Sequence, residues 1–156
     1  MNTTKTFLFI SDLVVSALVL GAVLVSAETK PNFSGTWELN VAKSDLGGAP
    51  ITRLVVQVEH KDPVFKYIAK GTADGQDIEE IETFTTDGKP STDSRGAKVV
   101  AHWDGAMLAI ETTGGDGKAL EDIRLSLSSD GKTLARVYER KSTDDPQKRH
   151  DIFEKQ

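Results

Sequence analysis

The chain has no cysteine among its 156 residues. This absence excludes disulfides as a source of stability, and it excludes a lipid-modified N-terminal cysteine. Histidine is nearly as scarce: His60, His102 and His150 each fall in a different predicted strand, at no spacing that suits zinc. Packing and backbone pairing must therefore hold the fold together, and neither a metal nor another cofactor is expected.

Clustered positive charge is also missing, and the formal net charge is −5 at pH 7. The densest basic group, Gln147–His150, is flanked by Asp145 and Asp151. Such a surface neither neutralises a row of phosphates nor is drawn to anionic lipid. Nucleic acid and anionic membrane surfaces are therefore not expected as partners.

Signatures of catalysis are lacking as well. The chain has no Gly-x-Ser-x-Gly nucleophile motif and no Gly-rich phosphate loop between a strand and a helix. The glycines of Gly114–Gly117 are better explained as a hairpin loop, and the acidic residues around Asp74 lack the spacing of an EF-hand. No catalytic residue is predicted, and we do not expect an enzyme.

One apolar run is present near the N-terminus, from Leu13 to Val25. Lys5 precedes it and Ser26-Ala27 follows it, which is the pattern of a secretory signal peptide covering residues 1–27. The run is too short to span about 30 Å of hydrocarbon comfortably as a helix. We therefore expect export to the periplasm or the exterior, with no stable membrane insertion after cleavage. An uncleaved N-terminal membrane anchor is the alternative.

Asp-Gly pairs punctuate the remaining domain, residues 28–156. They favour tight hairpin turns, because both central residues of a type I′ turn need positive φ. Five occur, at residues 74–75, 87–88, 104–105, 116–117 and 130–131. Nine strand-like runs lie around them: Gly35–Asn40, Ile51–His60, Val64–Lys70, Ile78–Thr86, Ala97–Trp103, Met107–Thr112, Leu120–Ser128, Thr133–Lys141 and Lys148–Glu154. The series predicts an antiparallel up-and-down meander.

Several of these runs alternate apolar and polar residues with period two, as half-buried strands do. The run Ile78–Thr86 alternates poorly, which suits an edge strand or a strand beside a cavity mouth. No helical stripe exceeds two turns, although Val41–Leu46 suits one short helical turn. An open meander would expose two edges, so we predict an all-β fold that closes into an eight- to nine-stranded barrel. A two-sheet sandwich is the alternative.

The first of these runs resembles a known family. Gly35-Thr36-Trp37 is similar to the Gly-x-Trp opening of the calycin superfamily, the lipocalins and fatty-acid-binding proteins. The longer stretch Pro31–Asn40, followed by Lys43-Ser44-Asp45, is similar to secreted, mostly uncharacterised bacterial lipocalin-like proteins. The resemblance implies a lipocalin-like barrel in which Gly35 and Trp37 close one end.

A second resemblance lies near the other end of the chain. Thr133–Arg140 is similar to the final strand of fatty-acid-binding proteins, where an Arg-x-Tyr pair holds the ligand carboxylate. Residues two apart share a strand face, so Arg136 and Tyr138 can converge on one anion. Two departures are clear: Val41–Pro50 is too short for the helical lid of that family, and a further strand follows.

Other placements of these side chains remain open at this stage. Arg136 and Tyr138 can instead face solvent, and the resemblance to lipocalins allows Arg136, Arg140 or Arg149 to cover the ring of Trp37. Phe65 and Tyr67 share one strand face and become cavity-wall candidates if the barrel is hollow. Trp103 ends an alternating apolar face, which suits either the core or a ligand platform.

The function predicted from these features is that of an exported, non-enzymatic binding protein. Its ligand is a small hydrophobic or amphipathic molecule that can carry a carboxylate, with Arg136, Tyr138, Tyr67, Phe65 and Trp103 as candidate ligand residues. The alternative is a structural or interaction protein of the cell envelope with a side-chain-filled barrel. Chemistry at the barrel mouth is a third reading, which fold alone does not license. The sequence predicts no oligomeric state.

Overall fold

The structure is a computed structural model that describes residues 29–156, so the predicted signal peptide, residues 1–27, lies outside the described residues. Ten strands are present in this part of the chain: β1 (Gly35–Leu39), β2 (Ile51–Lys61), β3 (Val64–Ala73), β4 (Gln76–Thr85), β5 (Pro90–Thr92), β6 (Lys98–Asp104), β7 (Met107–Thr113), β8 (Ala119–Leu127), β9 (Thr133–Arg140) and β10 (Gln147–Lys155). One short 3-10 helix, η1 (Val41–Lys43), follows β1. Within this range no helix has the length and apolar character needed to cross a bilayer.

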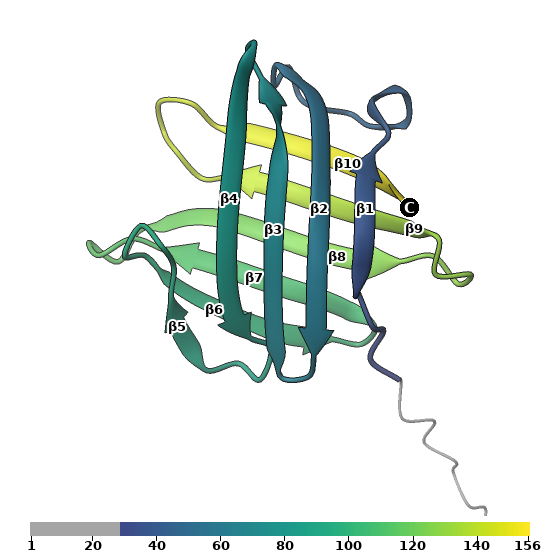
Figure 1. Ribbon diagram of the computed structural model, residues 1–156. Coiled ribbons are helices and arrows are strands. Elements are labelled where there is room, and N and C mark those ends of the chain that lie inside the picture. Colours follow the sequence, from purple (N-terminus) through teal and green to yellow (C-terminus); the bar gives the residue numbers. More distant parts are fainter. Residues whose placement is uncertain (1–28) are drawn as a thin grey trace, which may run out of the picture.

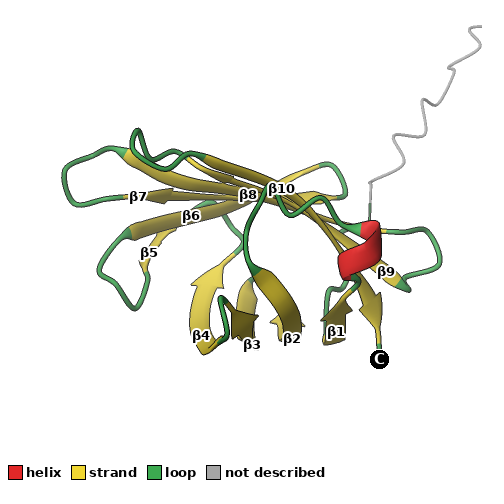
Figure 2. Cartoon of the chain, turned by 90° about the horizontal axis from the view of Figure 1, so that it is seen from above, coloured by secondary structure: helices red, strands yellow, loops and turns green. Residues whose placement is uncertain are grey.

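The strands form one antiparallel sheet in the order β4-β3-β2-β1-β10-β9-β8-β7-β6-β5. Consecutive strands of the chain are paired, apart from β4 and β5, which form the two edges of the sheet. The first strand, β1, also pairs with the last, β10. Strands β1–β4 form a front layer and β6–β10 cross behind it (Figure 1), and the view from above shows the two layers facing each other (Figure 2). The predicted all-β meander is confirmed as a nearly closed barrel.

Each of the nine predicted runs overlaps one observed strand, with ends that differ by up to three residues, and the short helical turn is confirmed as η1. The strand that the sequence does not predict is β5, which has three residues and begins with a proline. Three residues are too few to show a period-two pattern, and proline is depleted in strands. The strand count is therefore ten rather than eight or nine.

The Asp-Gly pairs do not all form the turn that we predicted for them. Only Asp74 and Gly75, between β3 and β4, both have positive φ, at 53° and 72°. At three other pairs the aspartate carboxylate accepts a hydrogen bond from the backbone N–H two residues further on, with Asp87 bonded to Lys89, Asp116 to Lys118 and Asp130 to Lys132. Those aspartates shape the turn through the side chain.

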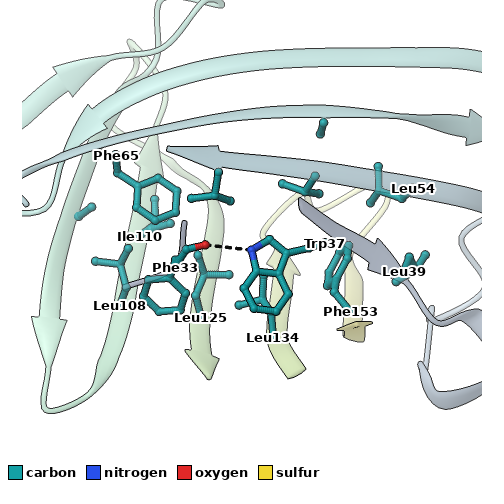
Figure 3. Close-up of a cluster of buried hydrophobic side chains, with 14 of the residues drawn as sticks. Phe33, Trp37, Leu39, Leu54, Phe65, Leu108, Ile110, Leu125, Leu134 and Phe153 are labelled. Atoms are coloured by element: carbon teal, nitrogen blue, oxygen red, sulfur yellow. Dashed lines mark hydrogen bonds between the residues drawn. The ribbon is translucent and has the colours of Figure 1, made fainter. Parts of the chain in front are cut away.

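Large side chains fill the end of the barrel around Trp37, which we call the closed end (Figure 3). Strand β1 sets Trp37 opposite Val56 of β2 and Lys155 of β10. The Trp37 indole donates a 2.9 Å hydrogen bond to the carbonyl oxygen of Phe33, and both side chains are fully buried. The tryptophan is thus a core aromatic that also fixes the segment leading into β1.

Strand β4 is an edge strand, as its poor alternation suggested, because it pairs only with β3. All six residues from Gln76 to Ile81 are exposed. Further along, the backbone N–H and hydroxyl of Ser94 both donate to Glu82, which ties β4 to the loop between β5 and β6. The opening in the barrel therefore lies beside the first half of β4.

Candidate ligand-binding site

A cavity of about 270 Å³ lies between the two layers of the barrel. Its apolar wall comes from strands of both layers and comprises Val56, Val58, Phe65, Ile110, Ile123, Leu125, Leu134 and Phe153. Its polar side chains are Tyr67, Glu80, Arg95, Glu121, Arg136, Tyr138, Arg140 and Arg149. An apolar wall with a few convergent polar groups is the usual make-up of a small-molecule site.

Four of the five predicted ligand residues line this cavity: Phe65, Tyr67, Arg136 and Tyr138. Alternation along β9 explains the inward direction of the last two, because Leu134 and Arg140 share their face and line the cavity as well. Trp103 is not brought to it. Its ring stacks on Phe33 at 6.0 Å between centroids, and its indole N–H points to the carboxylate of Asp62.

The antiparallel register of β9 and β10 decides what Arg136 contacts. Asp151 lies directly opposite Arg136, and Arg149 lies directly opposite Tyr138. The Nε and Nη2 atoms of Arg136 donate to Oδ2 of Asp151 at 2.8 and 2.6 Å, and Asp151 is fully buried. The guanidinium of Arg136, which the sequence assigned to a ligand, is therefore already hydrogen-bonded to a carboxylate of the protein itself.

Arg149 has no such partner. Its guanidinium lies over the ring of Tyr138, 4.2 Å from the centroid, and its side chain is 11% exposed. The Nε atom is buried without a hydrogen bond, with Oδ2 of Asp151 still 3.8 Å away. Burial, and then the charge of Arg136, lower the pKa of Arg149. Two largely buried cations thus share one buried carboxylate, and Arg149 is the one left without a hydrogen-bonded counter-charge.

The remaining cavity arginines each have a hydrogen-bonded carboxylate. Arg95 donates to Glu121 at 3.3 and 3.4 Å, and Arg140 donates to Asp145 at 2.7 Å. Glu121 also accepts a 3.2 Å hydrogen bond from the Tyr138 hydroxyl, and burial raises the pKa of that phenol. Among the arginines that line the cavity, Arg149 alone has no hydrogen bond to a carboxylate.

Tyr67 and Glu80 add a second polar pair on β3 and β4. Burial, followed by the charge of Glu80, raises the pKa of Tyr67, so the phenol stays protonated. Partial desolvation beside the cavity also raises the pKa of Glu80, although the residue keeps contact with solvent and its hydrogen bond with Tyr67 acts in the opposite direction. The cavity therefore holds donors and acceptors on the side away from its apolar wall.

The ring of Trp37 is covered by a cation, but not by any of the three arginines considered above. The Nζ atom of Lys155 lies 5.3 Å from the ring centroid, whereas Arg136, Arg140 and Arg149 line the cavity. A side chain at Gly35 would come within 3.0 Å of the Lys155 chain, at a φ of 146°. Glycine suits this position because it adopts the positive φ without strain and has no Cβ to crowd the Lys155 side chain.

A larger hollow, of about 640 Å³, lies on the outer face of β2–β4. It is lined by Arg53, Val55, Gln57, Ile68, Lys70, Gly71, Thr72, Asp77, Ile78 and Glu79, none of which was a predicted ligand residue. Its walls are mostly polar and charged. Between residues 29 and 156, no group of three or more His, Asp or Glu side chains is placed to hold a metal ion.

Arg149 is a cavity residue that sequence reasoning did not include among the candidate ligand residues. A signal for it was present, because Arg149, Asp151 and Phe153 alternate on one face of the last predicted strand. What the sequence did not supply was the register between β9 and β10, which decides which arginine the carboxylate reaches.

Comparison with known proteins adds evidence on the fold. No family model and no curated protein matches the sequence. Zebrafish ileal bile acid-binding protein, complexed with cholic acid, aligns with a TM-score of 0.56 and 13% identity over 80% of this chain and 98% of its own. Secretory abundant heat soluble protein 4 from Ramazzottius varieornatus aligns with a TM-score of 0.55 and 13% identity over 82% and 96%.

Identities of 13% speak for the fold alone, and both alignments cover nearly the whole of the other chain. In this chain, the aligned part is the antiparallel meander whose first and last strands pair with each other. The chain therefore shares the overall fold of these two solved structures.

Proposed function

We propose that this protein is a non-enzymatic binding protein that holds a small amphipathic carboxylate in the barrel cavity. The observation that carries the proposal is Arg149, whose largely buried guanidinium lies beside an apolar wall and whose Nε atom makes no hydrogen bond. A buried charge is costly unless it is paired and hydrogen-bonded. A ligand carboxylate would supply the missing pair, and the apolar wall would take the rest of the molecule.

The comparison of folds supports a binding role of this kind. One of the two aligned structures is a bile acid-binding protein in complex with cholic acid. This chain keeps the barrel but lacks a helical lid between β1 and β2, where it has only η1 and a loop. Entry between β4 and the strands that face it would suit this arrangement, because β4 is hydrogen-bonded on one side only.

Displacement of a fluorescent fatty-acid analogue tests the proposal. We expect the Arg149→Gln variant to bind octanoate at least about 30-fold more weakly than wild type, since truncating one partner of a buried charged pair costs about 2 kcal/mol or more. Arg124→Gln is the matched control, because Arg124 lies on β8 and is exposed. Equal octanoate affinity in the Arg149→Gln variant would contradict the proposal.

We also propose that the protein is exported, to the periplasm or the exterior, as a secreted bacterial lipocalin-like protein. The support is the apolar run at Leu13–Val25 followed by Ser26-Ala27. Mass spectrometry of the protein from its native cells should find an N-terminus at Glu28. An intact N-terminus in the membrane fraction would favour the alternative, an N-terminal anchor.

A second candidate function is that of an envelope interaction protein whose barrel is filled by side chains. The observation that favours it is the closed end, where Phe33, Trp37 and Leu108 are fully buried. This candidate predicts that no displacement of any probe from the cavity is measurable. It also predicts that Arg149→Gln leaves function in the cell unchanged.

A further inference from the structure

The closed end limits how deep a ligand can reach. Phe33 lies in the segment that precedes β1, and its fully buried side chain points into the barrel. There its ring packs edge to face against Phe65, with 6.0 Å between the centroids. Phe65 in turn stacks on Phe84 at 5.1 Å. These rings belong to the same buried cluster as Trp37 and Leu108, and Figure 3 shows Phe33, Phe65, Trp37 and Leu108 gathered between the strands. A chain cannot extend through them without displacing a fully buried aromatic side chain.

The other boundary of the cavity is charged. Arg95 and Glu121 form an ion pair there, and Glu80 and Arg140 line the same cavity. A methylene chain that left the cavity past these groups would lose the burial that stabilises it and would desolvate charged side chains. An apolar tail is therefore best accommodated when it ends inside.

The volume of the cavity then sets the size of the ligand. A water molecule takes about 30 Å³ in the liquid, so a cavity of about 270 Å³ corresponds to roughly nine waters. Denser packing of a covalent chain raises this to about nine to twelve non-hydrogen atoms. Octanoate and decanoate lie in this range, whereas hexadecanoate and cholate are well beyond it.

We infer that the cavity selects compact amphipathic anions of the size of octanoate to decanoate, with the carboxylate on Arg149, and discriminates against long-chain fatty acids and bile acids. This inference rests on the proposed function and adds the class of ligand. The rings of the closed end, Phe65 above all, are the groups that set the limit, since Phe65 lines the cavity and contacts both Phe33 and Phe84.

Calorimetric titration of the protein with straight-chain carboxylates tests it. We expect affinity to rise by about fourfold for each added methylene up to about ten carbons, because each buried methylene contributes a similar free energy of transfer from water. Beyond that length the affinity should level off or fall. A series in which hexadecanoate binds tightest would overturn the inference while leaving the proposed function intact. A series in which no carboxylate binds would contradict the proposed function, and the inference with it.

Enlarging the cavity gives the complementary test. In Phe65→Leu the ring is removed and an apolar side chain remains, and we expect the chain length of tightest binding to move two or more carbons higher. Ile110→Ala enlarges the same wall from β7 and provides a second variant should the first fold poorly. Ile81→Ala is the matched control, because Ile81 is 51% exposed and does not line the cavity. An unchanged optimum in both folded cavity variants would overturn the size limit.

Discussion

Single residues decide which arginine is available to a ligand. Arg136 and Asp151 are direct cross-strand partners, and the carboxylate receives two hydrogen bonds from one guanidinium. Interactions between side chains that lie directly opposite each other on neighbouring strands contribute to the stability of a sheet. Asp151 is therefore a brace: it holds Arg136 in place and lowers the electrostatic cost of keeping both buried arginines.

Removal of that brace is a stringent test of the buried cluster. In Asp151→Asn the charges of Arg136 and Arg149 would lie buried without a counter-charge, so we expect the free energy of unfolding to fall by about 3–5 kcal/mol. Urea denaturation measures this change. Asp144→Asn, in the exposed loop between β9 and β10, is the control and should cost less than about 0.5 kcal/mol. A similar decrease in the free energy of unfolding in both variants would contradict this role of Asp151.

At the scale of elements, most of the meander could be predicted from the sequence. Period-two alternation and Asp-Gly turns locate nine of the ten strands, because both signals act over a few neighbouring residues. Strand β5 has too few residues to carry such a signal. The inward direction of Arg136 also follows from alternation, but its pairing with Asp151 depends on the register across the β9–β10 loop, which no local pattern fixes.

Strand β4 shows how a free edge is protected. Its first half is exposed and carries Asp77, Glu79 and Glu80, and the whole strand has no basic residue. If a second copy paired with this edge in antiparallel fashion, carboxylates would face carboxylates, and like charges opposite one another are destabilising. Charged side chains are a common means of blocking such pairing.

Neutralising this edge should therefore promote self-association. We expect the double variant Asp77→Asn/Glu79→Gln to sediment as larger species than wild type at the same protein concentration in sedimentation velocity. Asp122→Asn/Glu139→Gln makes the same change of net charge on the internal strands β8 and β9, and should behave as wild type. Equal association of both variants would point to net charge rather than to the edge.

At the scale of the whole molecule, the two ends of the barrel differ in the side chains that fill them. The closed end is packed with aromatic rings, and the opposite region holds the arginines and carboxylates of the cavity. His60 belongs to the closed end: its ring lies between Phe33, Phe65 and Trp103, with centroids 5.3 to 5.9 Å away. Its Nδ1 atom accepts a hydrogen bond from the backbone N–H of Phe33. The stability of the closed end therefore depends on a neutral imidazole.

This dependence predicts how stability changes with pH. Burial lowers the pKa of His60 below 6.5, with Asp62 opposing the shift and Lys30 adding to it. The unfolded chain therefore binds a proton at His60 before the folded chain does, so this contribution to stability is complete above pH 6.5 and is lost as the pH falls below it. Glu80, whose pKa is raised by burial, acts with the opposite sign, because its protonation favours the folded state.

Urea unfolding at closely spaced pH values between about 7 and 5 separates the two groups. We expect the free energy of unfolding to decrease with falling pH in the wild type, and this slope to flatten or reverse in His60→Gln, where only the carboxyl contribution is left. His102→Gln, at an exposed position on β6, is the control for replacing a histidine. If His60→Gln retained the full slope, the loss of stability at low pH would have to come from groups other than His60, and the dependence of the closed end on a neutral imidazole would be contradicted.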